Sequence, residues 1–458
     1  MPRRPGFALP LLPSSPSAPP APQIGPPADF SLGFPADEGA RNVRRRKPER
    51  GVGSKGSVME DLIYLDNAAT SFPKPDVTHN TARDFYRDNG VNPGRTGCDM
   101  ALRAEEMIHG TRKLLSDFFN PSLVAAGIEK DPNRMVFTMN ATMSLNLIIN
   151  GTVGPGDHVV TTAVEHNSVI RPVNHRVKAG AEATYVSPDA EGYLDPEDIR
   201  RAIKANTTLV IVNHGSNVSG VVQDLKAIGA VCEEEGVPLA ADASQTAGVI
   251  PIDMKEFNLS FVAFTGHKSL FGPPGTGGVC VADDAHIEGT IYGGTGVRSA
   301  HPYHLEEFPY RLEAGTLNMA GIAGLSAGVR WVLDKGVEHI HDHEMKLLGM
   351  LQEGLDQIPG ITIFGTRNLE RRVPTMSVTL ENYDAADVGV FLDVDHDILT
   401  RTGLHCAPLI HEHYGTAPRG TVRFSPGPFN TEDQILKAIK AVETIQAQRP
   451  AQATVVGG

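Results

Sequence analysis

Apolar runs and polar positions alternate along residues 60–320 in a way that predicts strands interleaved with helices. Short continuous apolar runs predict buried strands at 63–65, 135–139, 158–162, 183–186, 208–212, 237–242 and 261–264. Apolar residues at helical spacing between these runs predict helices over 102–119, 140–149, 196–205 and 225–235. Such alternation is typical of an α/β domain with a mostly parallel sheet and helices on both faces.

The pattern changes after residue 321. A helix is predicted over 322–335, strands over 362–364, 375–380 and 421–425, and a last helix over 432–446. We therefore expect a large domain over 59–321, whose first part (59–75) lines the site entrance, and a smaller α+β domain over 322–448. Residues 449–458 are expected to form a flexible tail.

Residues 1–58 differ in composition from the rest of the chain. They contain 12 of the 34 prolines, and they carry nine basic against four acidic residues. Because such a segment buries too little apolar surface to fold, we expect a disordered, proline-rich basic tail. The basic run at 44–47 has a second interpretation as a targeting or nucleic-acid signal, and Met59 is an alternative start of the chain.

Composition narrows the class of protein. A net charge of −13 argues against nucleic acid as a general partner. The four cysteines are widely spaced and form no CxxC pair, which suits a reducing cytoplasm. No apolar run reaches the length of a membrane span, so we expect no membrane association.

Two strand ends carry complementary chemistry. The run at 261–264 ends in Thr265-Gly266-His267-Lys268, and the run at 237–242 ends in Asp242. A lysine at the end of an apolar strand is desolvated, which lowers its pKa and frees its amine. A lone lysine is more often a surface residue, but an acid on the neighbouring strand changes that interpretation. Lysine and an acid are the groups that pyridoxal phosphate needs, for a Schiff base and for its pyridinium nitrogen.

The motifs around these residues resemble a known family. DASQ at 242–245 and TGHKSLFGPPGTGG at 265–278 resemble the class V aminotransferases, a group of fold-type I, pyridoxal-phosphate-dependent transferases. Within that group the chain is similar to the cysteine desulfurases and selenocysteine lyases, from about Tyr64 to Ile445. The resemblance implies L-cysteine or L-selenocysteine as substrate and a role in sulfur metabolism, including iron–sulfur cluster biogenesis.

The resemblance also implies a set of cofactor contacts. His166 corresponds to the residue that stacks on the cofactor ring, and Asn217 to the one that approaches its phenolate and the substrate carboxylate. A helix N-terminus suits the phosphate, and the whole expected cofactor set is Ala141, Thr142, His166, Asn217, Asp242, Gln245, Thr265, His267, Lys268 and Thr316. Thr316 matches a threonine that reaches the phosphate in the other subunit, so a homodimer is expected.

A second chemical centre lies at 401–415, which reads RTGLHCAPLIHEHYG. It resembles the segment around the nucleophilic cysteine of the desulfurases, in the form with a short ordered loop, and makes Cys406 the expected nucleophile. A protonated histidine neighbour favours the thiolate form of a cysteine. Arg423 matches the residue that holds the substrate α-carboxylate, because a guanidinium binds a carboxylate bidentately, and Arg401 is a second substrate contact.

The cysteines and their neighbouring histidines allow other interpretations. His405, Cys406, His411 and His413 are candidates for a zinc site, but their spacing fits no usual zinc motif, so no metal is expected. Cys232 and Cys280 are expected to be inert and buried, in a helix and a strand. The family usually has histidine where this chain has Cys98, which leaves the role of that position open.

The expected mechanism follows from these residues. Lys268 binds the cofactor and, once freed, removes the substrate Cα proton, with His166 assisting protonation. The Cys406 thiolate then attacks the substrate sulfur, keeps it as a persulfide for a sulfur-acceptor protein, and alanine is released. The alternatives are a selenocysteine lyase, or a class V aminotransferase or lyase acting on another amino acid, which needs Lys268 but not Cys406.

Overall fold

A seven-stranded sheet is the largest element of the computed structural model, which describes residues 62–93 and 98–448. The strand order is β2-β8-β7-β6-β5-β3-β4. The bounds are Met135–Thr138 for β2, His158–Thr162 for β3, Glu182–Val186 for β4, Thr207–Asn213 for β5, Leu239–Asp242 for β6, Phe261–Thr265 for β7 and Gly277–Val281 for β8. β8 runs antiparallel to β2 and β7, and the remaining pairs are parallel. The predicted mostly parallel sheet is therefore confirmed.

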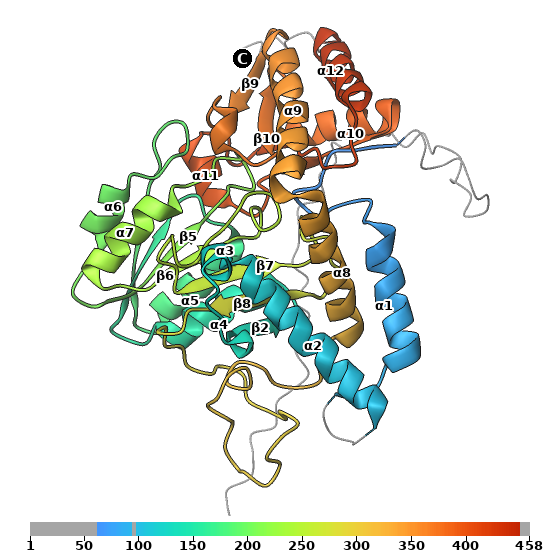
Figure 1. The fold of residues 1–458 in the computed structure, drawn as a ribbon. Coiled ribbons are helices and arrows are strands. Elements are labelled where there is room, and N and C mark those ends of the chain that lie inside the picture. Colours follow the sequence, from blue (N-terminus) through green and yellow to red (C-terminus); the bar gives the residue numbers. More distant parts are fainter. Residues whose placement is uncertain (1–61, 94–97, 449–458) are drawn as a thin grey trace, which may run out of the picture. The chain divides into compact units, whose positions relative to one another are not determined.

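Helices cover both faces of this sheet (Figure 1). In β5, Val210 and Val212 belong to one buried cluster, together with Ile228 of α7, whereas Leu209 and Ile211 belong to another. Residues of α2, α6, α7 and α8 line the first cluster, and residues of α4 and α5 line the second. The bounds are Asp99–Phe118 for α2, Ala141–Thr152 for α4, Asn167–Lys178 for α5, Pro196–Ala202 for α6, Leu225–Glu235 for α7 and Met319–Lys335 for α8.

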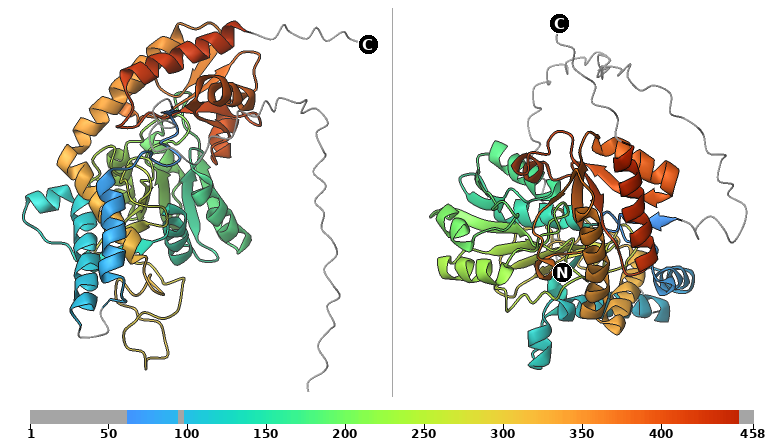
Figure 2. Two further views of the ribbon diagram at one scale, coloured as in Figure 1. Left: turned by 90° about the vertical axis from the view of Figure 1, so that its right-hand side faces the viewer. Right: turned by 90° about the horizontal axis from the view of Figure 1, so that it is seen from above.

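Helix α1 (Asp76–Asn89) was not predicted from the sequence. Thr78 is its single buried residue, so it lacks the apolar stripe that reveals a helix. It lies beside α8, as Figures 1 and 2 both show. The short α3 (Pro121–Ala125), which follows α2, has no buried residue and was also not predicted.

The C-terminal part contains a second, antiparallel sheet with the order β12-β13-β10-β9. Its elements are α9 (Val337–Asp356), β9 (Ile361–Phe364), β10 (Met376–Leu380), α10 (Ala385–His396), β11 (Ile398–Leu399), β12 (Arg401–Gly403), α11 (Pro408–His413), β13 (Thr421–Phe424) and α12 (Glu432–Ala447). This sheet has a hydrophobic core of its own with α9, α10 and α12. β1 (Ile63–Tyr64) pairs with β11, and Ile63 joins the same core. The predicted α+β layer is present.

Some predictions about domain organisation stay predictions. The boundary at residue 322 falls within α8, which is one continuous helix. The tails predicted for 1–58 and 449–458, with residues 59–61 of the predicted large domain, lie outside the described residues. Within the described ranges, no helix is long and apolar enough to cross a membrane.

Candidate active site

Chemically active side chains gather at the carboxyl edge of the large sheet. His166 follows β3, Asn217 follows β5, Asp242 ends β6 and Lys268 follows β7. Because these strands are parallel neighbours in the order β7-β6-β5-β3, their carboxyl ends meet at the same edge. The helix α4 begins at the same edge, after β2. The structure therefore brings together the predicted residues of this edge.

Lys268 is partly buried at this edge. Burial lowers the pKa of its amine to about 8, while the nearby charge of Asp242 acts in the opposite direction. The preceding residue is held by the entrance segment: the His267 carbonyl accepts a hydrogen bond from Lys74 Nζ at 2.8 Å. The His267 ring also contacts Thr70, with 3.1 Å between Nδ1 and Oγ1. These contacts fix the main chain immediately before the lysine.

The acid and the histidine are each fixed by a neighbouring serine. Asp242 is buried, and its Oδ1 accepts hydrogen bonds from the backbone N–H and the hydroxyl of Ser244. His166 caps α5, and its Nδ1 accepts from the Ser168 N–H at 3.1 Å. Burial lowers the pKa of His166 to about 4, so the ring is neutral at pH 7. Since Nδ1 is the acceptor, Nε2 carries the ring proton.

The edge also offers unused donors that suit a phosphate group. The Thr265 hydroxyl is buried and has no hydrogen-bond partner among the described residues. Gly277 pairs with Thr265 on one side and with Thr138 on the other. A Cβ at Gly277 would lie 2.8 Å from the Cα of Asn140, so the turn that starts α4 lies directly over this strand. The first N–H groups of a helix have no partner inside it and attract anions, so Ala141 and Thr142 fit a phosphate beside Thr265.

Two further predicted cofactor residues, Gln245 and Thr316, have surroundings that differ from each other. Gln245 is buried and donates from Nε2 to the Ala68 carbonyl at 3.0 Å, which joins it to the entrance segment. Thr316 is exposed and lines a cavity of about 390 Å³ together with Thr295 and Glu313. Lys268 does not line that cavity. Thr316 and Lys268 of the same chain therefore do not share this cavity.

Cys406 is exposed on the loop between β12 and α11. Its φ is +59° and that of His405 is +48°, so two successive residues with a Cβ have left-handed backbone. Two contacts hold this conformation to the large sheet. Asn217 Nδ2 donates to the His405 carbonyl, and the Asn167 N–H donates to the Cys406 carbonyl, each at 2.7 Å. Such backbone persists where its surroundings over-determine it.

The charged neighbour of the Cys406 sulfur is Arg401. Its Nη2 lies 3.6 Å from Sγ. The expected protonated histidine is absent at His405, because that ring is buried and burial holds its pKa far below the usual range. His405 Nε2 instead lies 2.9 Å from the hydroxyl of Thr421. The adjacent histidine is therefore neutral and structural, and a guanidinium replaces it beside the thiol.

Arg423 is 1% exposed and links three parts of the site. Its Nη2 donates to Asp66 Oδ1 at 2.6 Å and its Nη1 to the Asn217 carbonyl at 3.0 Å. Its Nε is buried and has no partner among the described residues. The unpartnered Nε lies beside Nη2 on one edge of the guanidinium, and such an edge is the geometry that a carboxylate binds.

The histidines of the alternative zinc interpretation have other partners. His411 Nδ1 lies 2.7 Å from the Thr416 hydroxyl, and His413 Nε2 lies 2.9 Å from the Asp189 carbonyl. Among residues 62–93 and 98–448, no group of three or more His, Cys, Asp or Glu side chains is placed to hold a metal ion. The absence of a metal stays a prediction. Cys232 and Cys280 are buried in α7 and β8, as expected.

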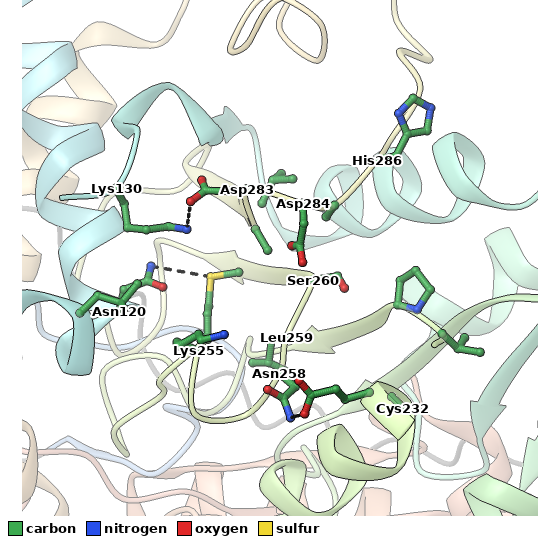
Figure 3. A pocket seen from close by; sticks show the side chains of 18 of the residues that line it. Asn120, Lys130, Cys232, Lys255, Asn258, Leu259, Ser260, Asp283, Asp284 and His286 are labelled. Atoms are coloured by element: carbon green, nitrogen blue, oxygen red, sulfur yellow. Dashed lines mark hydrogen bonds and ion pairs between the residues drawn. The ribbon is translucent and has the colours of Figure 1, made fainter. Parts of the chain in front are cut away.

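A larger pocket of about 720 Å³ lies at the opposite, amino edge of the sheet (Figure 3). It is lined by residues that precede β6 and β7 and by those that follow β8, including Leu259 and Asp283. Lys130 reaches across it to Asp283, and the pair forms a salt bridge. None of the predicted site residues lines this pocket, so its size does not make it the active site.

The model of the family "Aminotransferase class-V" matches residues 63–437. The chain belongs to this family. A "Probable cysteine desulfurase" of Methanothermobacter thermautotrophicus is 32% identical over 394 residues, covering 85% of this chain and 96% of that protein. "Cysteine desulfurase IscS" of Vibrio campbellii is 30% identical, covering 84% of this chain and 92% of that one. The family resemblance read from the sequence is thus confirmed.

A solved structure gives the same result. The apo structure of a cysteine desulfurase from Thermococcus onnurineus NA1 is similar with a TM-score of 0.78 and 32% identity. The similarity covers 84% of this chain and 95% of that one. The fold class predicted from the motifs is therefore confirmed, and the chain falls in the cysteine desulfurase group of its family.

Several residues of the site were missed at the sequence level. Asp66 pairs with Arg423, Lys74 binds the His267 carbonyl, and Asn167 binds the Cys406 carbonyl. Asp66 lies in the segment YLDNAAT at 64–70 and Asn167 in the segment EHNS at 165–168, each close behind a predicted strand, so their positions carried a signal. Lys74 had none, because its partner is a main-chain carbonyl far away in the sequence.

Proposed function

We propose that this protein takes sulfur from L-cysteine, releases alanine and holds the sulfur as a persulfide on Cys406. The observation that carries the proposal is that two reactive groups, Lys268 and Cys406, are held at the same edge of the sheet. An exposed cysteine is fixed by Asn167 and Asn217 to the same sheet edge that carries Lys268. The relatives named cysteine desulfurase support this function.

The class V family depends on pyridoxal phosphate, and the residues at the sheet edge fit it. Lys268 would bind it covalently, Asp242 would pair with its ring nitrogen and His166 would lie on its ring. Its phosphate would take donors from Thr265, from Ala141 and Thr142 of α4, and from Thr316 of a partner copy. Gln245 and His267 would be further cofactor contacts. When bound, the cofactor supplies an electron sink for the carbanion that forms at the substrate Cα.

Binding and proton transfer are then tasks of the protein's own side chains. The free Nε edge of Arg423 takes the substrate α-carboxylate, with Asn217 beside it. Arg401 contributes a second positive charge near Cys406. With its pKa lowered to about 8, Lys268 is partly a free amine at pH 7 and can remove a proton from the substrate Cα. The Nε2 proton of neutral His166 is available for return to the substrate.

Sulfur transfer follows with a closed electron balance. The Cys406 thiolate attacks the substrate sulfur, so a new S–S bond forms while the substrate C–S bond breaks. The electron pair of the broken bond remains with the carbon skeleton, which takes up protons and leaves as alanine. No external oxidant is needed, because the carbon is reduced as the two sulfurs are oxidised. The persulfide is then passed to an acceptor, which we propose to be a thiol-bearing protein.

Two further features belong to this proposal. A homodimer places Thr316 of one copy at the phosphate of the other, which agrees with the exposure of Thr316 in a cavity that Lys268 of its own chain does not line. A site that works through a thiolate suits a reducing compartment, so we propose the cytoplasm as its location.

The test is an assay of alanine and sulfide released from L-cysteine by purified protein with a reductant. We expect equal amounts of alanine and sulfide, and loss of both when Lys268 is replaced by alanine. Activity on L-selenocysteine is measured in parallel, to decide between the desulfurase and the selenocysteine lyase interpretation. Turnover of another amino acid, with no sulfide from L-cysteine, would favour the aminotransferase interpretation instead.

A further inference from the structure

Four successive main-chain carbonyls after β5 each accept a hydrogen bond from the C-terminal part of the chain. They belong to residues 217–220, which we call the carbonyl segment. The Asn217 carbonyl accepts from Arg423 at 3.0 Å and that of Val218 from the Ser377 hydroxyl at 2.7 Å. The Ser219 carbonyl accepts from Arg372 Nη2 and the Gly220 carbonyl from the Val373 N–H, each at 2.8 Å.

The backbone at the end of this segment leaves little room for movement. Gly220 has a φ of +76°, and a Cβ at this position would lie 2.2 Å from the Thr375 carbonyl oxygen. Glycine is therefore required for the close approach of the two main chains. Residues 218–220 of the carbonyl segment therefore lie against β10 and the residues before it, and Asn217 lies against β13.

Arg372 is the unusual member of this contact. Its side chain is 0% exposed, yet its partners among the described residues are neutral. Besides the Ser219 carbonyl, it donates to the carbonyls of Thr366 at 2.8 Å and Thr375 at 2.9 Å, and to Gln352 Oε1 at 3.0 Å. Burial lowers the pKa of this guanidinium to about 10, so it remains charged at pH 7. A buried charge needs such dense hydrogen bonding, because it costs several kcal/mol otherwise.

The carbonyl segment begins with a residue of the active site. Asn217 uses its side chain to hold the His405 carbonyl, and Asn167 holds the next carbonyl, that of Cys406. The strained backbone at His405 and Cys406 therefore depends on where Asn217 lies. The position of Asn217 in turn depends on the donors that hold the carbonyl segment.

We propose that Arg372 is a positioning residue for sulfur transfer, acting through the Ser219 carbonyl on Asn217 and through Asn217 on the Cys406 loop. This inference rests on the proposed role of Cys406. Arg372 itself touches neither substrate nor the reacting sulfur. Its expected effect is larger on the transfer step than on substrate binding, which depends mainly on Arg423, or on cofactor binding, which depends mainly on Lys268.

The test compares Arg372→Met with Arg372→Lys in the full-length holoenzyme, with Arg371→Leu as the matched control. Arg371 is exposed, and its side chain stacks on Tyr193 rather than on the carbonyl segment. We expect kcat for sulfide release to fall by about 10- to 100-fold in Arg372→Met, the size that displacement of a reacting group produces. The KM for L-cysteine should change by less than about threefold, because the contact of Arg423 with Asp66 does not involve the carbonyl segment. Arg372→Lys should recover part of kcat, and Arg371→Leu should match the wild type.

Hydrogen exchange supplies a readout that does not depend on activity. The Asn167 N–H lies on α5, far from Arg372 in the sequence, and is protected by its bond to the Cys406 carbonyl. Loosening of the Cys406 loop should speed its exchange in Arg372→Met. Ser377→Ala removes one donor from the Val218 carbonyl and should speed the same exchange by about fivefold, the factor for one hydrogen bond.

The outcomes separate the possibilities. Unchanged Asn167 exchange and unchanged kcat in Arg372→Met overturn the proposal, and so does faster exchange confined to 217–220. If Arg372→Met does not fold, the exchange of the Asn167 N–H and kcat are measured in Ser377→Ala and Arg372→Lys instead, and unchanged values in both variants overturn the proposal. If the wild-type protein releases no sulfide, the proposed function fails, whereas the exchange of Asn167 still decides whether Arg372 holds the Cys406 loop.

Discussion

The two proposed nucleophiles of this protein, Lys268 and Cys406, lie in opposite surroundings. Lys268 follows a fully buried strand, among a neutral His166 and a buried Asp242, and burial lowers its pKa to about 8. Cys406 is exposed on a loop with two successive left-handed residues. Burial lowers the pKa of the lysine amine, whereas the backbone conformation fixes the position of the cysteine.

This difference matches what each group has to do. An amine that attacks a carbonyl or removes a proton must lose its own proton, and desolvation achieves that without a mobile part. A thiol that passes sulfur to another molecule must remain accessible. Its backbone is fixed by Asn167 and Asn217, while its side chain stays open and has Arg401 beside it.

The largest expected effect is the loss of the thiol. In Cys406→Ala, sulfide release from L-cysteine should fall by at least about 10³-fold, because attack on the substrate sulfur has no nucleophile. Binding of L-cysteine should persist, since it depends on Arg423 and Lys268. Cys98→Ala is the matched control and should keep wild-type turnover. Loss of turnover in Cys98→Ala, with Cys406→Ala fully active, would show that the wrong cysteine had been assigned.

The amine should reveal its lowered pKa through the pH dependence of cofactor uptake. Lys268 is a protonated, unreactive ammonium below its pKa of about 8 and a free amine above it. The rate at which apoprotein takes up pyridoxal phosphate should therefore rise by about tenfold between pH 7 and pH 9, with a midpoint near 8. The uptake is followed by absorbance in stopped flow. A rate that is still rising steeply above pH 10 would mean that Lys268 is not desolvated.

The positive charge of Arg401 should change the rate at which Cys406 reacts with an alkylating reagent. Alkylation of Cys406 by anionic iodoacetate at pH 7 should slow by about fivefold in Arg401→Ala, because the carboxylate of the reagent loses the guanidinium that lies 3.6 Å from Sγ. Arg401→Lys should restore part of the rate. The measurement is peptide mass spectrometry over time. Equal rates in all three proteins would show that Arg401 does not affect the reactivity of Cys406.

Much of the surroundings of Lys268 could be predicted from the sequence, but less of the surroundings of Cys406. A buried strand is a continuous apolar run, and parallel strands bring their following residues to one edge, so Lys268, Asp242 and His166 were predictable. Left-handed backbone at His405 and Cys406 leaves no pattern in residue type. The bonds of their carbonyls to Asn217 and Asn167 join segments that are distant in the chain, and such contacts appear only in the fold.

The histidine prediction shows the same limit. A histidine next to a cysteine suggested a protonated neighbour, but the fold buries His405 and leaves Arg401 as the cation. Helices α1 and α9 were missed for different reasons. α1 buries one residue, so it has no apolar stripe, whereas α9 buries Leu347, Leu348, Leu351 and Leu355, a stripe at helical spacing that the sequence does carry.

The smallest expected effect concerns Glu165, a buried acid beside His166. Burial raises its pKa to about 8 from an ordinary 4.5, so the folded protein keeps a proton that the unfolded chain releases. Its contribution to stability is therefore full below pH 4.5 and is lost as pH rises towards 8. Glu165→Gln, which stays neutral, should gain in Tm over the wild type as pH rises from 5 to 8, by about 5 °C.

Exposed Glu353→Gln is the control for this change and should show no pH-dependent gain. The measurement is a thermal melt of both variants and the wild type at each pH. A Tm difference for Glu165→Gln that stays constant from pH 5 to pH 8 would mean that Glu165 is ionised in the fold. The surroundings of Lys268 would then be more accessible to water than the contrast with Cys406 requires.

The central claim is that the exposed, backbone-held Cys406 receives the sulfur. Mass spectrometry of proteolytic peptides tests it most directly, after holoenzyme is mixed with L-cysteine without reductant and alkylated at once. The account predicts one additional sulfur atom on the peptide that contains Cys406, and none on the peptides that contain Cys98, Cys232 or Cys280. Release of alanine with the added sulfur on Cys98, or with none on Cys406, would contradict it.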